Sequence, residues 1–188
     1  MTSKVEIISS ALTLLGKAPV NSIGSGPPIV DAVSTMFDLV YPDLLTAHKW
    51  CFATSFKVLT PLVQTPQIDR WQYAYLLPSD LLHLYGTYPE TLNYARYENY
   101  IYTNQYPTLT IEYAFLADIN KWPIYFKNLM VVTLAAYAAM AVTENETLHQ
   151  DYSQKALNYL ISARSRDSQQ QPAPVMKRDP IYSRKFGG

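Results

Sequence analysis

Few residues of this 188-residue chain have the types and spacing that chemistry at a protein site requires. The three histidines, His48, His83 and His149, lie far apart, and none forms the i, i+4 pair that places two imidazoles on one metal ion. Cys51 is the only cysteine and lies in an aromatic stretch, which favours a small buried side chain over a thiolate nucleophile. We therefore expect no catalytic, metal-binding or cofactor-binding residue, and no internal disulfide.

Two other kinds of site need to be weighed. The loop Gly24-Ser25-Gly26-Pro27-Pro28 has the glycines of a phosphate-binding loop but no lysine, and its prolines remove backbone N–H donors, so it predicts a plain loop. Glycoside hydrolysis needs two carboxyl groups about 5 to 9.5 Å apart, and 15 Asp and Glu residues can always supply such pairs. With 16 Tyr and 3 Trp to stack on sugars, a glycan-binding or glycan-hydrolysing protein stays open as an alternative.

The C-terminal segment is the strongest sign of a function. Residues 1–163 carry 9 basic and 13 acidic side chains, whereas residues 164–188 carry 6 basic and 2 acidic ones. Cations alternate there with apolar side chains that could anchor the segment on a partner: Lys177, Arg178, Ile181, Tyr182, Arg184, Lys185 and Phe186. Three prolines and the absence of apolar periodicity predict an extended arm over 167–188 that becomes ordered on a protein partner. A solubilising tail and weak, unspecific DNA binding are the alternatives.

Helical patterns flank the middle of the chain. A capping box formed by Ser3 and Glu6 predicts a helix over about 3–16, and prolines at 27 and 28 open a second one over 28–49. Pro42 predicts a kink near Asp38, or two short helices in place of one. Further helices are expected over 123–142 and 145–166. The apolar run 129–142 is shorter than the roughly 20 residues that cross a bilayer, so it predicts a buried central helix.

The region between these helices predicts antiparallel strands. Alternating segments rich in Tyr and Ile occur at 71–78, 81–89, 94–104 and 109–115, separated by Pro, Ser, Asp and Asn. We expect an α+β chain, mainly α: about four helices in a bundle, a β-rich insertion over about 55–118 and the extended arm. The folded domain would then span 1–166.

The order of these motifs resembles a known family. The segments IISSALTLLGKAPVNSI, LLTAHKWCFA, WQYAYLLPSDLL and KWPIYFKNLMVVTLAAYAA together resemble the head-to-tail adaptor proteins of short-tailed bacteriophages, often called tail tubular protein A, over about residues 5–165. The resemblance implies a structural virion protein without enzymatic activity. It would be made in the host cytoplasm and found at the head–tail junction.

The resemblance also implies partners. Such adaptors form a twelve-fold ring under the portal protein, extend the DNA channel and attach the tail nozzle protein, so contact with genomic DNA is unspecific and no membrane is involved. Their C-terminal extension embraces the portal, which here corresponds to residues 169–188 and to the arm residues named above. The β-rich insertion, here 71–115, would face the nozzle or a neighbouring subunit, and its candidate interface residues are Trp71, Tyr73, Tyr75, Tyr97, Tyr100 and Tyr102.

Overall fold

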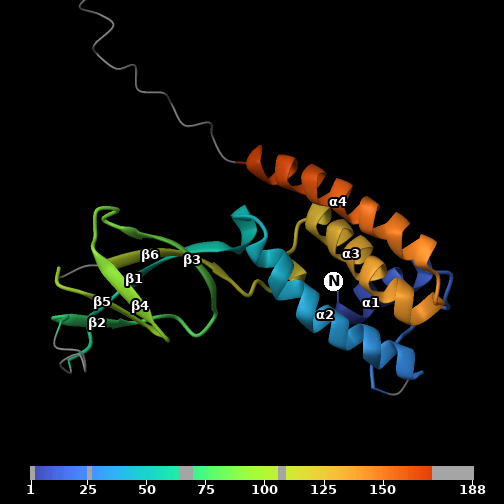
Figure 1. Cartoon of the computed structure of the whole chain (residues 1–188), viewed down its shortest axis with the longest axis horizontal. Helices are drawn as coiled ribbons and strands as arrows, with labels where there is room; N and C mark the ends of the chain where they lie inside the picture. The colour runs from blue at the N-terminus through green and yellow to red at the C-terminus, as the bar shows by residue number, and fades with distance from the viewer. Residues whose placement is uncertain (1–2, 25–26, 64–69, 106–108, 171–188) are drawn as a thin grey trace, which may run out of the picture.

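The computed structural model describes residues 3–24, 27–63, 70–105 and 109–170 of the chain. In these residues the chain forms four α-helices and two small antiparallel sheets, each of three strands, which confirms the predicted α+β class. The helices gather at one end of the molecule and the strands at the other (Figure 1).

The first two helices begin where the sequence predicts. Helix α1 (Lys4–Leu14) begins with the capping box, in which the Ser3 hydroxyl accepts from the Glu6 N–H and the Glu6 carboxylate accepts from the Ser3 N–H. Gly16 follows with φ of +73°, the left-handed conformation that ends helices readily at glycine. Helix α2 (Pro28–Thr46) runs through Pro42 without interruption, so the alternative of two short helices is wrong.

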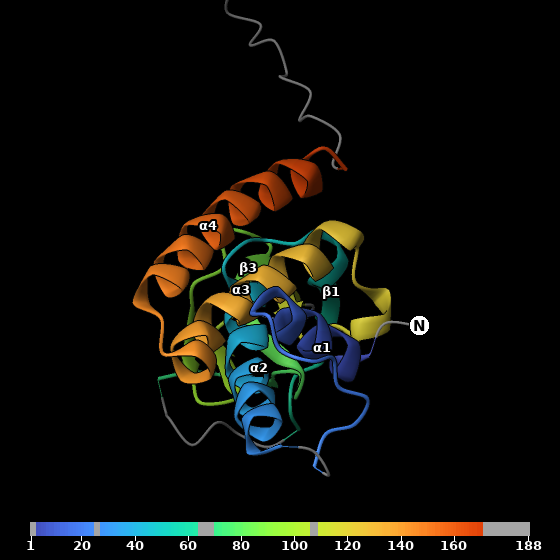
Figure 2. The same cartoon turned by 90° about the vertical axis from the view of Figure 1, so that its right-hand side faces the viewer.

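The last two helices lie side by side (Figures 1 and 2). Helix α3 (Ile124–Thr143) contacts each of the other three helices, and α4 (Glu146–Ser168) lies on its outer side. Helix α3 is long and apolar enough to cross a membrane by length and composition, although the shorter run seen in the sequence is not. About 61% of its most apolar window is buried by its neighbours, so in this fold it is the central core helix.

Aromatic side chains fill the helical core next to the sheets. Trp50 is fully buried between α2 and α3, and its ring lies edge-on to Phe126 at 5.1 Å. Its indole N–H donates to the carbonyl of Leu44 at 2.8 Å, so the polar atom of this large side chain is satisfied. Phe37 and Trp122 stack at 6.2 Å on the other side of the same cluster.

The six strands form a small sandwich. One sheet has the order β1 (Thr54–Leu59), β6 (Leu109–Phe115) and β3 (Leu81–Tyr88), and the other has β2 (Tyr73–Leu76), β5 (Tyr100–Thr103) and β4 (Tyr94–Tyr97). The sequence predicts a single segment over 94–104, but Glu98 adopts φ of +51° and turns the chain into the β4–β5 hairpin. Strand β1 was not among the four strand segments that the sequence singles out.

The sandwich has a core of its own. Side chains that face inward from both sheets bury one another, and they are Leu59, Tyr75, Leu77, Leu92, Ile101, Leu109, Ile111 and Tyr113. Two contacts fasten this core to the helices: the Tyr85 hydroxyl donates to the carbonyl of His48 at 3.2 Å, and Lys49 pairs with Glu112 at 2.5 Å. The molecule therefore has two packed cores, joined by the segment that follows α2 and by the segment 116–123 that returns from β6 to α3.

Candidate interaction surfaces

The predicted arm residues lie outside the residues that the structure describes. These are Lys177, Arg178, Ile181, Tyr182, Arg184, Lys185 and Phe186. What the structure does describe is the point from which the arm starts. Helix α4 continues to Ser168, two residues beyond the predicted end of the folded domain, and Asp167 is completely buried. Asp167 therefore belongs to the folded body.

Asp167 fastens the last turn of α4 to the start of the sandwich. Its carboxylate accepts from the Tyr125 hydroxyl at 2.6 Å and from the Cys51 N–H at 3.0 and 3.2 Å. The Gln170 amide donates to the same hydroxyl at 3.3 Å. These bonds satisfy a buried charge that would otherwise be costly, because an ion without partners loses its hydration on burial. We call Asp167, Tyr125, Cys51 and His48 the Asp167 cluster.

The electrostatics of the Asp167 cluster favour a structural role. Burial, and then the hydrogen bond to Asp167 and its charge, raise the pKa of Tyr125, so this hydroxyl remains a donor at all ordinary pH values. Burial lowers the pKa of His48, although the Asp167 carboxylate opposes that effect. A lowered pKa keeps the His48 ring mostly neutral at pH 7, so its nitrogen 3.6 Å from Asp167 contributes little as an ion pair there.

Cys51 is half-buried, and its thiol donates to the main-chain carbonyl of Asp167 at 3.5 Å. The sequence placed this cysteine in the core, and the structure places it at the boundary between the two halves. Among the described residues, no three His, Cys, Asp or Glu side chains come together in an arrangement that could hold a metal ion.

The six candidate interface residues of the insertion divide into two groups. Tyr75 is completely buried and Trp71 is 8% exposed, so the structure corrects both: they are core side chains that a partner cannot reach. Tyr73 is half-buried against the sandwich core. The alternation along β5 and β4 places Tyr97, Tyr100 and Tyr102 on the outer face of their sheet.

These three tyrosines form a continuous aromatic surface. The ring of Tyr102 lies 5.9 Å from that of Tyr97 and 6.1 Å from that of Tyr100. Leu76, which pairs with Tyr100 across the sheet, is also exposed on this face. We call Leu76, Tyr97, Tyr100 and Tyr102 the tyrosine face. Exposed apolar surface of this kind is typical of contacts with another protein chain.

A second exposed surface lies on the helices, and no pattern in the sequence predicts it. An apolar groove of about 500 Å³ opens between α2, α3 and α4. Leu129 and Leu160 line it, and Tyr137 and Leu157 on its rim are more than half exposed. The Thr133 hydroxyl in this groove is buried and has no hydrogen-bond partner among the residues that the structure describes. We call this feature the α3–α4 groove.

No protein-family model matches the chain, and no curated protein matches it significantly.

Proposed function

We propose that the chain is a structural head-to-tail adaptor of a short-tailed bacteriophage. In this proposal it docks as a ring, of twelve copies as in the family it resembles, under the portal protein, extends the DNA channel and attaches the tail nozzle. It needs no cofactor and carries out no catalytic turnover. The four helices act as the bundle next to the channel, and the sandwich faces the nozzle or a neighbouring copy.

The observation that carries the proposal is the presence of two different exposed apolar surfaces, one on each half of the molecule. The tyrosine face lies on the sandwich, and the α3–α4 groove lies on the helices. A ring is closed by heterologous contacts, in which each copy offers one surface to the next copy and a different one to the previous copy. Two unlike apolar surfaces on one chain meet this requirement.

The exposure of α4 supports the same proposal. In a helix of 23 residues, only Ala163 and Asp167 are buried, while Leu157, Tyr159 and Ile161 remain 43 to 67% exposed. Apolar residues on a helix usually face a core, so the side of α4 that carries Leu157 and Ile161, one turn apart, is suited to a partner chain. The basic C-terminal segment follows directly from this helix and would reach the portal from its end.

A portal-binding assay tests the proposal. Portal rings from the same virus are pelleted with the full chain, with residues 1–170, and with a full-length Tyr182→Ala, Phe186→Ala variant. The truncation ends at Gln170 because a cut at residue 166 would also remove the buried Asp167. We expect the full chain alone to pellet with the rings. Equal binding by residues 1–170 would refute the role of the arm, and no binding by the full chain would refute the adaptor.

A further inference from the structure

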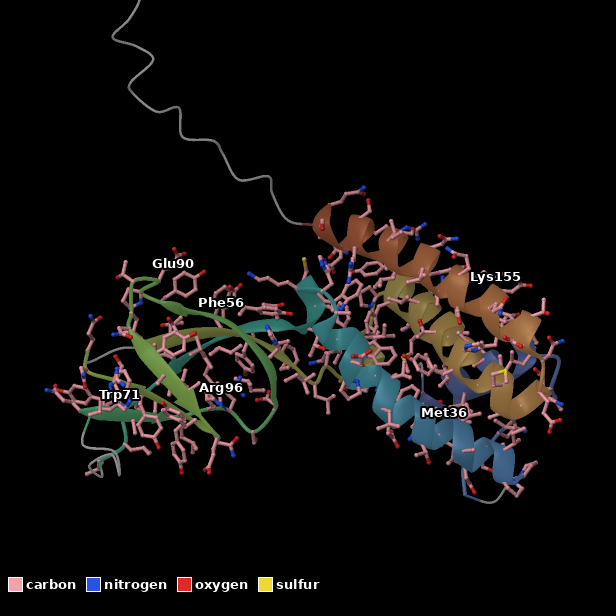
Figure 3. All side chains as sticks on the ribbon, in the orientation of Figure 1. Met36, Phe56, Trp71, Glu90, Arg96 and Lys155 are labelled. Atoms are coloured by element: carbon pink, nitrogen blue, oxygen red, sulfur yellow. The ribbon has the colours of Figure 1, made fainter. Side chains whose placement is uncertain are left out.

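A cleft in the sandwich gathers most of the positive charge of the β-rich half. Residues 54–118 contain three basic and six acidic side chains. Two of the three basic ones, Lys57 and Arg96, line a cleft of about 500 Å³, and no carboxylate of the described residues lines it. Figure 3 shows Arg96 projecting from β4 toward the connection between β2 and β3. We call this feature the Lys57–Arg96 cleft.

The strand geometry explains why these two cations face the same space. Lys57 and the core residue Leu59 lie two positions apart on β1, so both side chains lie on the inner side of their sheet. Arg96 pairs with the core residue Ile101 on the neighbouring strand, so it lies on the inner side of the other sheet. Both side chains are exposed, so the two cations lie at the open edge of the space between the sheets and approach it from opposite sides.

Neither cation is neutralised within the structure. Among the residues that the structure describes, the side chains of Lys57 and Arg96 make no ion pair, hydrogen bond or ring contact. By contrast, Lys4 and Lys49 each pair with a carboxylate. Two like charges that share a cleft repel each other, and a bound anion would remove that repulsion.

The rest of the lining limits the kind of anion. Leu77 and Leu81 supply an apolar side, Leu76 of the tyrosine face reaches the cleft at its edge, and Ser79 and Asn99 supply polar groups. None of the described lining residues is aromatic, so no ring is present on which a sugar could stack. The acidic excess of residues 54–118 opposes an extended polyanion such as DNA. A single carboxylate flanked by aliphatic groups fits both parts of the lining.

The strands at the cleft favour a peptide as the carrier of that carboxylate. Lys57 and Arg96 lie on β1 and β4, and each of these is an edge strand of its sheet. An edge strand has unpaired backbone groups to which an extended peptide can add. We propose that the Lys57–Arg96 cleft binds an acidic peptide segment of a partner protein, with its carboxylate between the two cations and its aliphatic side chains on the leucines. This inference does not depend on the adaptor proposal.

Peptide titration of the full chain tests the inference. The probes are the acidic tetrapeptide acetyl-Leu-Asp-Glu-Leu-amide and its neutral counterpart acetyl-Leu-Asn-Gln-Leu-amide. Binding of each peptide is measured from the NMR chemical shifts of the Ser79 and Asn99 amides. We expect the acidic peptide to shift both amides, and Lys57→Gln or Arg96→Gln to weaken its binding about tenfold each, because each loses a charge-assisted contact. Arg70→Gln changes the third basic residue, which lies outside the cleft against Trp71, and is the matched control.

Three results would overturn the inference. One is equal binding of the neutral peptide, another is an equal loss of binding in Arg70→Gln, and the third is the absence of any shift at about 10 mM acidic peptide, which is above the Kd expected for a weak carboxylate contact. Tighter binding of a glucuronate disaccharide than of the peptide would assign the cleft to acidic sugars instead.

A second readout needs no ligand. Because Lys57 and Arg96 line the same cleft and repel each other, Lys57→Gln or Arg96→Gln is expected to raise the Tm at low salt, and this gain is expected to shrink at about 1 M salt. Arg70→Gln, which loses the contact with the Trp71 ring, is expected to lower the Tm slightly and not to raise it at low salt. A fall of several degrees in either cleft variant would mean that the cations hold the sandwich together, which would also overturn the inference.

Discussion

Replacing Asp167 by Ala tests whether this carboxylate fastens the end of α4 to the body. The side chain is completely buried and accepts from the Tyr125 hydroxyl at 2.6 Å and the Cys51 N–H at 3.0 Å. A hydrogen bond to a charged group contributes about 1.5–3 kcal/mol, and its removal leaves a buried donor without a partner. Two such bonds are lost, and water that enters at the end of α4 can partly replace them. We therefore expect Asp167→Ala to lower the free energy of unfolding by about 3 kcal/mol.

Urea unfolding followed by tryptophan fluorescence measures this loss. Trp50 precedes Cys51, and its ring stacks on Tyr125 at 6.3 Å, so its emission reports on the Asp167 cluster directly. With an m-value of about 2 kcal/mol/M, a loss of about 3 kcal/mol moves the midpoint by about 1.5 M. Asp151→Ala removes an exposed carboxylate from the same helix and is the matched control, for which we expect no shift of the midpoint.

A double-mutant cycle isolates the bond to Tyr125. Tyr125→Phe removes only the hydroxyl, so we expect a smaller loss than in Asp167→Ala and a coupling energy of about 1–2 kcal/mol between the two sites. The reasoning is refuted if Asp167→Ala costs less than about 0.5 kcal/mol, which is the effect of an ordinary surface substitution. Zero coupling with Tyr125 would show that the loss comes from another contact.

Three further predictions concern other parts of the molecule. Burial raises the pKa of Tyr41 from 10.0 to about 12, so folding is favoured while this hydroxyl stays protonated. The free energy of unfolding is therefore expected to fall between pH 10 and 12, as measured by urea unfolding at each pH. The fall is expected to be smaller in Tyr41→Phe. Tyr75→Ala removes a fully buried ring and is expected to lower the free energy of unfolding by about 3–5 kcal/mol. Tyr97 is 53% exposed, so Tyr97→Ala is expected to lower it by no more than about 0.5 kcal/mol. The same variant is expected to weaken self-association in sedimentation velocity. Leu157→Asp on the rim of the α3–α4 groove is expected to preserve the circular dichroism spectrum and to block ring assembly on the portal, and normal assembly would exclude the groove as a subunit contact.

Local sequence signals predicted much of the fold. The capping box and Gly16 marked both ends of α1, and Pro28 marked the start of α2, because these residues act through the backbone next to them. The alternation in 81–89 and 109–115 predicted β3 and β6. Strand β1 was harder to find, because Phe56 and Val58 are exposed on its outer face and it has no simple alternation of apolar and polar residues.

Long-range contacts decided what the sequence missed. In the sequence, Asp167 is the first residue of the predicted basic arm. Its hydrogen bond to Tyr125, 42 positions earlier, places it in the folded domain instead. A signal was present, since Asp167 continues a stripe at helical spacing that comprises the half-buried Tyr152, Ala156 and Leu160 and the buried Ala163. Trp71 and Tyr75 were expected at an interface because aromatic residues occur both at interfaces and in cores. Only the packing of the two sheets shows that these two side chains are buried.

The number of copies bound to the portal is the most direct test of the central claim. Native mass spectrometry of portal rings saturated with the full chain counts the bound subunits, and residues 1–170 serve as the comparison. The account predicts one complex with a full ring of twelve full-length copies and no stable complex with the truncation. A portal ring that stays free of the full chain at saturating concentrations would contradict the adaptor function.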